Sequence, residues 1–261
     1  MKLALINFSG NVGKTTLAKE VFQRHMKCEI YAVESINSTS SEAVKINSDD
    51  FAELQSKMLL EDDLIIDIGS SNVEGLIDQI GQYYGSQDEF DYFVVPVIPE
   101  NKQIADTAQT ILHLVDRMEI PPQKIKVIFN RVQSISSESS KLSPINSLLK
   151  QLKIENNCTY VLDTPYYSEI ANLIDYGLAP SDEEDKLTNI DYVVNSYSDF
   201  RAKAIDYKKK SLSAENAEDK EKFGILAEQY SKLTIISRLG VRVLENLDVA
   251  FNELFPKKIK K

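Results

Sequence analysis

The chain has 261 residues, of which 43% are hydrophobic and 27% charged, a composition ordinary for a globular protein with a large core. Its net charge of −10 argues against a surface built throughout for nucleic acid. The sequence has no apolar run of the roughly 20 residues that span a bilayer, and Met1 leads directly into a predicted strand. We therefore expect a cytoplasmic protein. Cys28 and Cys158 are far apart in the sequence and both lie beside predicted strands, so we expect buried free thiols in place of a disulfide.

Charge is distributed unevenly along the chain. Residues 206–261 carry a net charge of +3, and the residues before them carry −13. The last five residues, 257–261, form a basic tail. Such a tail is compatible with contact to DNA and equally with an ordinary solvated terminus.

The first predicted elements are a strand at residues 2–7 and a helix at about 14–26, joined by a loop that ends in Gly-Lys-Thr. A strand, a glycine-containing loop and a helix in this order are typical of a phosphate-binding loop, in which backbone amides and the helix dipole face an anion. The strict motif has a glycine where this chain has Phe8, and the alternative interpretation is a turn in which Thr15 or Thr16 caps the helix.

The loop offers each type of group that a bound nucleotide requires. Lys14 would lie between the terminal phosphates, and the Thr15 hydroxyl would bind a magnesium ion. The glycines would let the backbone close around the phosphates, and Val12 must point its side chain away. The expected nucleotide-binding residues of the loop are Gly10, Asn11, Val12, Gly13, Lys14, Thr15 and Thr16.

A second part of the site is predicted where the apolar strand 64–67 ends. Asp67 is followed by Ile68 and Gly69, and a carboxylate at a strand tip opposite a phosphate loop can hold magnesium, often through water. We therefore expect Thr15 and Asp67 on the metal side, and Lys14 and Asp67 as the catalytic residues.

Strands and helices alternate along most of the chain, which predicts an α/β fold with a doubly wound, mainly parallel sheet. The segment 134–143 is rich in serine and reads as a linker. In the helix 101–118 we expect a buried stripe of Ile104, Ala108, Ile111, Leu112 and Val115. The other predicted strands are 29–33, 91–97, 126–132 and 159–162, and the other predicted helices are 51–60, 73–84, 145–152 and 168–176.

The C-terminal part is predicted to be helical. After Pro180 an acidic patch begins a helical segment to about residue 210, and 211–216 reads as a break. Helices at 217–236 and 241–254 follow, with Gly240 between them. We expect a nucleotide-binding domain at 1–180 and a helical extension with a basic tail at 181–261.

Four stretches together resemble a known family: Gly10 to Thr16, Asp67-Ile-Gly, Asn130-Arg131 and Asp163-Thr-Pro165. They are similar to motifs of the deviant Walker ATPases of the ParA/MinD group. The stretches 6–16 and 33–37 look closer still to the plasmid-stability StbB proteins. The resemblance covers about residues 1–180.

The resemblance implies binding of ATP and Mg²⁺, a homodimer that forms with Mg-ATP, and a role in plasmid stability, segregation or conjugative transfer. The partner would be a plasmid-encoded DNA-binding adaptor or DNA itself. By motif position, Asn130 would contact the adenine and the Pro165 loop would close over the base. Arg131, which follows Asn130, is expected among the nucleotide-binding residues.

Three departures from the family pattern concern hydrolysis. The signature lysine that reaches across the dimer corresponds to Ser9, and its second glycine corresponds to Asn11. The aspartate that orients the attacking water should fall near Ile36 or Asn37, where the one carboxylate is Glu34. Without the lysine, another cation such as Arg131 must offset the transition-state charge, or hydrolysis is slow.

Two functions therefore stay open at this point. The first is a weak ATPase whose nucleotide state switches dimerisation and partner binding. The second is a nucleotide-binding adaptor that no longer hydrolyses and acts through its C-terminal helices. A metabolic enzyme is a distant third, since the sequence offers no pocket pattern of histidines or paired acids.

Overall fold

Seven parallel strands form the sheet of this protein in a computed structural model that describes residues 1–34, 44–47, 51–83, 85–154 and 157–256. The strand order is β3-β2-β4-β1-β5-β6-β7, and all neighbouring strands are parallel. The expected α/β fold is thereby confirmed. The strands are β1 (Lys2–Leu5), β2 (Ile30–Glu34), β3 (Val44–Asn47), β4 (Leu64–Ile68), β5 (Tyr92–Val97), β6 (Ile125–Val132) and β7 (Cys158–Leu162). Strand β3 was not predicted, because its polar residues lack the apolar run of the other strands.

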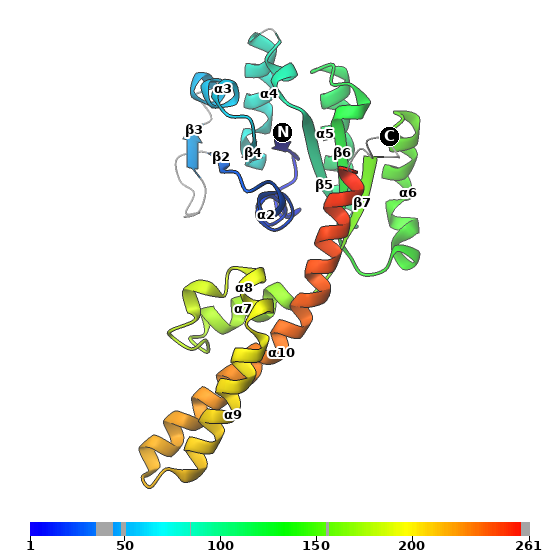
Figure 1. Ribbon diagram of the computed structural model, residues 1–261. Helices are drawn as coiled ribbons and strands as arrows, with labels where there is room; N and C mark the ends of the chain where they lie inside the picture. The colour runs from blue at the N-terminus through cyan, green and yellow to red at the C-terminus, as the bar shows by residue number, and fades with distance from the viewer. Residues whose placement is uncertain (35–43, 48–50, 84, 155–156, 257–261) are drawn as a thin grey trace, which may run out of the picture. The chain divides into compact units, whose positions relative to one another are not determined.

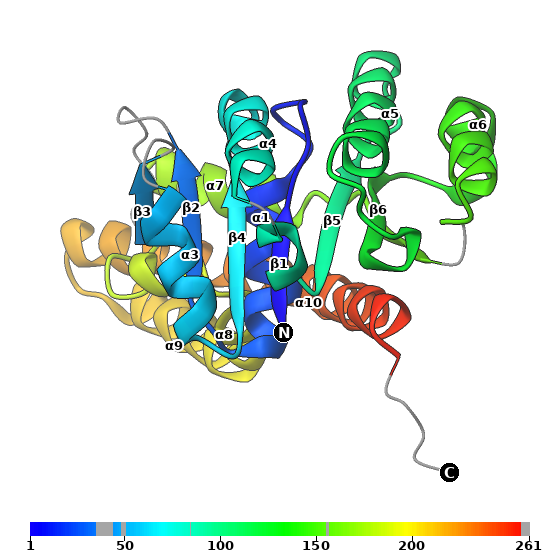
Figure 2. The same ribbon diagram turned by 90° about the horizontal axis from the view of Figure 1, so that it is seen from above.

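Helices cover both faces of the sheet (Figure 2). On one face lie α3 (Phe51–Leu60), α4 (Val73–Gln82), α5 (Asn101–Asp116) and α6 (Ile135–Gln151). On the other lies the helix after the first loop, which is α1 (Lys14–Leu17), the π-helical η1 (Ala18–Gln23) and α2 (Arg24–Met26) in succession.

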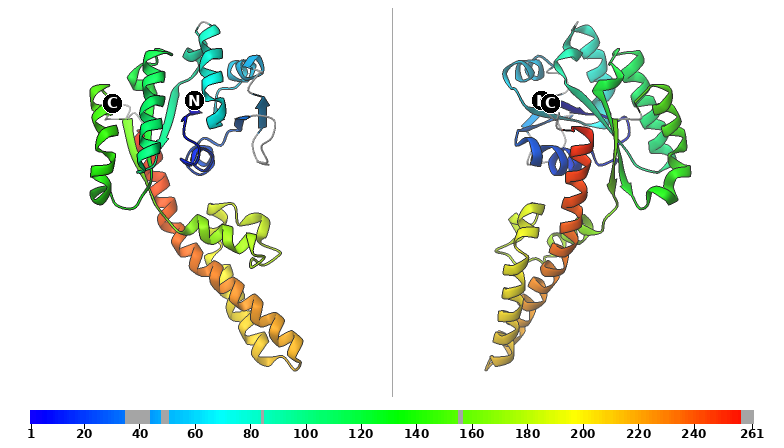
Figure 3. Two further views of the ribbon diagram at one scale, coloured as in Figure 1. Left: turned by 180° about the vertical axis from the view of Figure 1, so that it is seen from behind. Right: turned by 45° about the vertical axis from the view of Figure 1, so that its right-hand side comes forward.

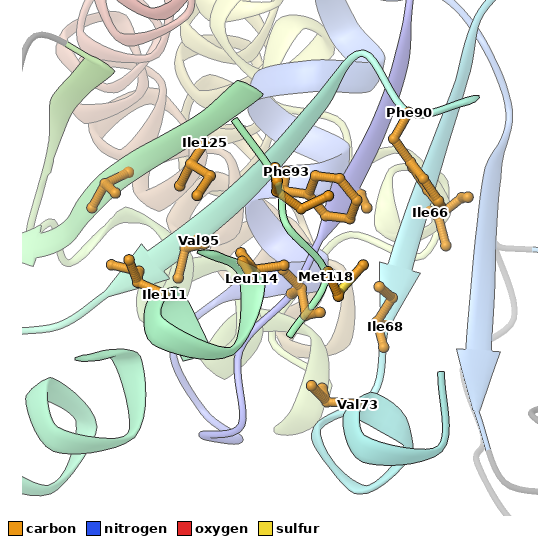
Figure 4. Packing of buried hydrophobic residues seen from close by; sticks show 14 of the residues in the cluster. Ile66, Ile68, Val73, Phe90, Phe93, Val95, Ile111, Leu114, Met118 and Ile125 are labelled. Carbon is orange, nitrogen blue, oxygen red and sulfur yellow. The ribbon is translucent and has the colours of Figure 1, made fainter. Parts of the chain in front are cut away.

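Both faces of the sheet are apolar because most strands are nearly continuous apolar runs, and successive residues of a strand point to opposite faces. In β1 and the residue after it, Ala4 and Ile6 belong to the core beneath α3 to α6, whereas the equally buried Leu3 and Leu5 do not. Figure 4 shows part of the core beneath α3 to α6, where Phe93 and Val95 of β5 lie near Ile111 and Leu114 of α5. This packing holds β1 and β5 in place, and with them the starting points of the loops that follow these strands.

The chain divides into two units, one of Met1–Asp163 with Leu247–Lys261 and the other of Thr164–Asn246. The boundary between the two units follows Asp163, whereas the sequence predicted a domain boundary at residue 180. The expected division into domains stays a prediction. The second unit contains α7 (Tyr166–Asp175), the short η6 (Glu184–Lys186), α8 (Ile190–Asn195), α9 (Tyr197–Ser213) and most of α10 (Ala217–Leu254). Figures 1 and 3 show α9 and α10 side by side as a helical hairpin.

The serine-rich segment 134–143 is not a linker, so that expectation was wrong. It forms the first half of α6, which continues through Pro144. Glu138, Leu142, Ile145 and Leu149 are buried at helical spacing and hold the helix against its neighbours. The proline is exposed, and so is the residue one turn before it, so water can satisfy the carbonyl that Pro144 leaves free.

The expected break at Gly240 was also wrong, because α10 is one helix of 38 residues. Gly240 is there for close packing within the second unit. A Cβ atom at this position would lie 2.6 Å from Cγ2 of Val194 and 3.1 Å from the ring of Tyr166. The single helical segment expected to residue 210 is instead η6, α8 and α9, and α9 runs on to Ser213, inside the expected break.

The last turns of α10 return to the first unit and pack on the helix that follows the loop. The ring of His25 stacks on Phe251 with centroids 4.2 Å apart, and its Nε2 lies 3.0 Å from a carboxylate oxygen of Asp248. Arg24 forms an ion pair with the same carboxylate. The end of α10 therefore steadies the helix whose first residues belong to the candidate site. In the described part of the chain, every helix is too short or too polar to cross a membrane.

Candidate functional site

The loop between β1 and α1 buries the side chain of Val12 and leads directly into a helix. Val12 is fully buried, whereas Gly10, Asn11, Thr15 and Thr16 are exposed along its outer side. The carbonyl of Gly13 accepts the first helical hydrogen bond, from the amide of Leu17 at 2.9 Å. The loop thus leads directly into a helix N-terminus whose free amides favour an anion.

The two glycines of the loop have different roles. Gly13 has a φ of +86°, and a Cβ atom there would lie 2.4 Å from Nδ2 of Asn130. Any other residue at 13 would therefore be strained and would clash. Gly10 has neither restriction, since its added Cβ would meet Oγ of Ser70 at an ordinary 3.6 Å. Only Gly13 is demanded by the geometry of the loop.

Lys14 is turned back onto the loop in which it stands. Its Nζ donates to the carbonyl oxygens of Ser9 at 2.8 Å and of Asn7 at 3.2 Å. Burial lowers the pKa of Lys14 from 10.5 to about 8, and the nearby charge of Asp67 opposes this shift. An ammonium group held at the loop by two carbonyl oxygens, in a poorly solvated place, is well suited to meet a phosphate.

Thr15 and Asp67 meet although they are distant in the sequence. Strands β1 and β4 are neighbours with Leu5 paired to Asp67, and the Thr15 hydroxyl donates to Oδ2 of Asp67 at 2.5 Å. A hydroxyl and a carboxylate side by side are a donor set that Mg²⁺ accepts when phosphate and water oxygens complete its shell. The described residues contain no group of three or more His, Cys, Asp or Glu that could hold a metal alone. The pair therefore fits a magnesium ion that arrives with a nucleotide.

Asn130 belongs to the site in a way that sequence reasoning did not find. Its Nδ2 donates to the carbonyl oxygen of Val12 at 2.9 Å, and its Oδ1 accepts from the amide of Arg131 at 3.0 Å. The side chain thereby ties the end of β6 to the loop. It stands where the resemblance places an adenine contact, but its amide nitrogen already binds the loop.

Arg131 follows with a left-handed φ of +54° and points into a different environment. It lines a cavity of about 320 Å³ at the ends of β5, β6 and β7, together with Pro99, Glu100, Glu138 and Asp163. Three carboxylates thus share the cavity with Arg131. Its expected part in nucleotide binding, or as a substitute cation, stays a prediction.

Helix α5 holds the start of the loop through residues that the sequence did not indicate as part of the site. Thr107 accepts at Oγ1 from Nδ2 of Asn7 at 2.8 Å, and Thr110 accepts from the amide of Phe8 at 3.0 Å. One turn further, the ring of His113 meets that of Phe8 edge-on, with centroids 4.9 Å apart. Residues 107, 110 and 113 thus form one line along α5 that faces the loop.

This line corrects the expected buried stripe of α5. The buried residues are Ile104, Thr107, Thr110, Ile111 and Leu114, whereas Leu112 is 38% exposed and Ala108 and Val115 are half-buried. The stripe is rotated because the two threonines face the loop. Their signal in the sequence was a pair of hydroxyl residues three apart beside apolar positions.

Asn7 completes the support from inside the loop. Its Nδ2 also donates to the carbonyl oxygen of Pro96 at 2.7 Å, and its Oδ1 accepts from the amide of Ser9 at 2.7 Å. Ser9 is buried and directs its carbonyl at Lys14. The position at which the ParA/MinD pattern has a lysine is thus part of the framework that holds Lys14.

The remaining expected residues belong to the second unit or lie outside the described chain. Pro165 is the residue before α7, in the second unit, and its role stays a prediction. Ile36 and Asn37 lie outside the described residues, as does the basic tail 257–261, and the side chain of Glu34 is not described.

No protein-family model matches this sequence, and no curated protein matches it. Among solved structures, an ATP complex of a variant of Cyanothece McdA is similar with a TM-score of 0.41 and 12% identity, over 67% of this chain and 90% of that one. The MinC:MinD cell division protein complex of Aquifex aeolicus is similar with a TM-score of 0.40 and 15% identity, over 70% of this chain and 91% of that one.

Proposed function

We propose that this protein binds ATP with Mg²⁺ through the loop 10–16 and uses the bound nucleotide as a switch. The observation that carries this proposal is the meeting of Lys14, Thr15 and Asp67 at the N-terminus of α1. A buried ammonium group, a hydroxyl and a carboxylate at a helix N-terminus are the groups that a magnesium-bound polyphosphate requires.

In this proposal each residue has one task. Lys14 leaves the carbonyls of Asn7 and Ser9 to bind the terminal phosphates, and Thr15 and Asp67 hold the magnesium ion. The ion neutralises phosphate charge when it is bound. In this proposal the base lies toward the ends of β6 and β7. The cavity beside Arg131 supports this placement.

The reaction we propose is slow hydrolysis of ATP. Catalysis of phosphoryl transfer depends on cations placed around the transferring group, and Ser9 stands where the resembled group has its lysine. A serine side chain carries no charge, and Ser9 is buried with its carbonyl on Lys14, so this position supplies no cation to a partner subunit.

The biological role we propose follows the resemblance to the StbB proteins. The Mg-ATP form is a homodimer in the cytoplasm that acts in plasmid stability, segregation or conjugative transfer. Its partner is a plasmid-encoded DNA-binding adaptor or DNA itself. The basic residues 257–261 support the DNA arm of this proposal.

The missing lysine favours a second candidate, an adaptor that binds the nucleotide without hydrolysing it and acts through its C-terminal helices. The two candidates differ in turnover and agree on binding. The experiment is therefore to measure ATP binding by calorimetry and phosphate release by the same preparation, each with a Lys14→Ala control.

Each outcome of this experiment decides something. Turnover that the control loses supports the slow ATPase. Binding that the control loses, with no turnover, supports the adaptor. Absence of ATP binding by the wild-type protein overturns both. Deletion of 257–261 tests DNA contact, since direct binding should weaken steeply with salt and the deletion should reduce that slope.

A further inference from the structure

Two serines follow the end of β4, and one of them faces the loop that begins after β1. Ser70 and Ser71 are the first residues of the short turn η2 (Ser70–Asn72), which leads directly into α4. Oγ of Ser70 lies 3.6 Å from the place that a Cβ atom on Gly10 would occupy. The loop and α4 are seen beside each other in Figure 2. The Ser70 hydroxyl therefore stands against the first glycine of the loop.

Backbone and side-chain hydrogen bonds hold this turn in one position. The amide of Gly69 donates to the carbonyl oxygen of Val33 at 3.0 Å, and Nδ2 of Asn72 donates to the same oxygen at 3.2 Å. The amide of Asn72 donates to the carbonyl oxygen of Gly69 at 2.9 Å, which closes the turn. Asn72 is buried, so these bonds are shielded from water. The position of Ser70 within the turn is thus set by β2 and β4.

The hydroxyl of Ser70 has no partner among the residues that the structure describes, although Ser70 is half-buried. The other hydroxyl groups around the loop are occupied. Thr15 donates to Asp67, and Thr107 and Thr110 accept hydrogen bonds from the start of the loop. A serine hydroxyl can donate one hydrogen bond, and an ionised phosphate oxygen is a strong acceptor. Ser70 is therefore available for a group bound in the loop.

Lys14 and Ser70 approach adjoining residues of the loop. Nζ of Lys14 lies 2.8 Å from the carbonyl oxygen of Ser9, and the Ser70 hydroxyl stands against Gly10, the next residue. In the proposed function, Lys14 leaves this carbonyl to bind the terminal phosphates. A terminal phosphate that draws Lys14 away from Ser9 would therefore arrive beside Ser70.

We propose that Ser70 donates a hydrogen bond to the terminal phosphate of bound ATP, and that this bond lets the protein distinguish ATP from ADP. This inference rests on the proposed function and adds to it the residue that reads the nucleotide state. ADP lacks the last phosphate, so it leaves the Ser70 hydroxyl without a partner. The hydroxyl brings no positive charge, so it serves recognition and does not replace the missing lysine in hydrolysis.

Ser71 supplies a matched control within the same turn. It is the next residue and is also a serine, but it is exposed. No atom of Ser71 lies within 4 Å of the place that a Cβ atom on Gly10 would occupy. Removal of its hydroxyl changes the composition of the turn in the same way without touching the proposed contact.

The test is calorimetric titration of the full chain in Mg²⁺ with ADP and with an ATP analogue in which nitrogen bridges the last two phosphorus atoms and prevents hydrolysis. Ser70→Ala should weaken binding of the analogue about tenfold and change ADP binding less than about twofold, because only the analogue carries the acceptor. Ser71→Ala should change neither affinity. Ser70→Thr keeps the hydroxyl and should bind the analogue within about threefold of the wild-type protein.

The ratio of the two affinities distinguishes contact with phosphate from support of the fold. A Ser70→Ala variant that loses affinity equally for both nucleotides, or for neither, overturns the inference and leaves the proposed function in place. A loss of discrimination in Ser71→Ala, or a Ser70→Thr variant that discriminates no better than Ser70→Ala, also overturns it. Absence of nucleotide binding by the wild-type protein overturns the proposed function itself, and this inference with it. Thermal unfolding checks that every variant is folded at the temperature of the titration.

Discussion

The side-chain amide of Asn130 donates a hydrogen bond to the carbonyl oxygen of Val12, 118 residues earlier in the chain, at 2.9 Å. The same Nδ2 lies 2.4 Å from the place that a Cβ atom on Gly13 would occupy. One amide group therefore both holds the loop and requires a glycine within it. The two loop glycines therefore differ, because the structure requires a glycine at position 13 and does not require one at position 10. The sequence alone does not distinguish them.

The first prediction concerns these glycines. Gly13→Ala should abolish ATP binding and destabilise the protein by more than about 1 kcal/mol, because it adds a clash to a positive φ. Gly10→Ala should stay within about 0.5 kcal/mol of the wild-type stability, since its Cβ would have ordinary contacts. Thermal unfolding and calorimetric titration with Mg-ATP measure both effects.

A double variant identifies the cause. Gly13→Ala with Asn130→Ala removes the clash but keeps the strained backbone, so part of the lost stability should return. If Gly13→Ala alone binds ATP like the wild-type protein, the described loop geometry is wrong.

The second prediction concerns the support from α5. Thr110→Val leaves the amide of Phe8 without its acceptor, and Thr107→Val removes an acceptor from Asn7. Each loss of a buried partner should cost about 1–3 kcal/mol of stability, and a looser loop should weaken ATP binding several-fold. Affinity is measured at a temperature where every variant is folded.

Thr159→Val is the matched control. Its hydroxyl is equally buried and bonds Glu253 at 2.5 Å, in a part of the first unit away from the loop. It should lower stability while leaving ATP affinity unchanged. Equal losses of affinity in all three variants would point to general destabilisation and remove the special role of α5.

The third prediction is a pH dependence of ATP binding. Burial lowers the pKa of Lys14 to about 8 in the free protein, and a bound phosphate would raise it again. Binding then takes up a proton above pH 8, so affinity should be constant below about pH 8 and fall by up to about tenfold per pH unit above it. Lys14→Arg keeps its charge throughout this range and should bind with a flat profile between about pH 7 and 9.5. An identical slope in both proteins would assign the titration to another group.

The fourth prediction separates magnesium from phosphate binding. Thr15→Val and Asp67→Asn each remove one member of the pair that meets at 2.5 Å. Both should reduce the gain in ATP affinity that Mg²⁺ provides to the wild-type protein by about tenfold or more, because each removes an oxygen suited to the ion. In a chelator, Thr15→Val should bind ATP like the wild-type protein. Undiminished magnesium stimulation in both variants would exclude this pair as the metal side.

Local patterns in the sequence were sufficient for much of the fold. The apolar strand before the loop, the Gly-Lys-Thr sequence and the strand that ends at Asp67 each depend on residues close together, and strand and helix periods are local properties. The same reasoning failed where packing overrides local preference. Pro144 and Gly240 are usual helix breakers, yet buried stripes and close contacts keep both inside helices.

The sequence by itself predicted a phosphate-binding loop after the first strand, with Lys14 and Thr15 in it, and it determined the parallel sheet beside which this loop lies. Only the tertiary structure decided that Asn130, Thr107 and Thr110 hold this loop. It also decided that the carbonyl of Ser9 accepts a hydrogen bond from Lys14. The physical reason is that a strand or helix is specified by neighbours a few residues away, whereas a hydrogen bond across 118 residues depends on how β1, α5 and β6 pack. Such a bond leaves no periodic trace in the chain.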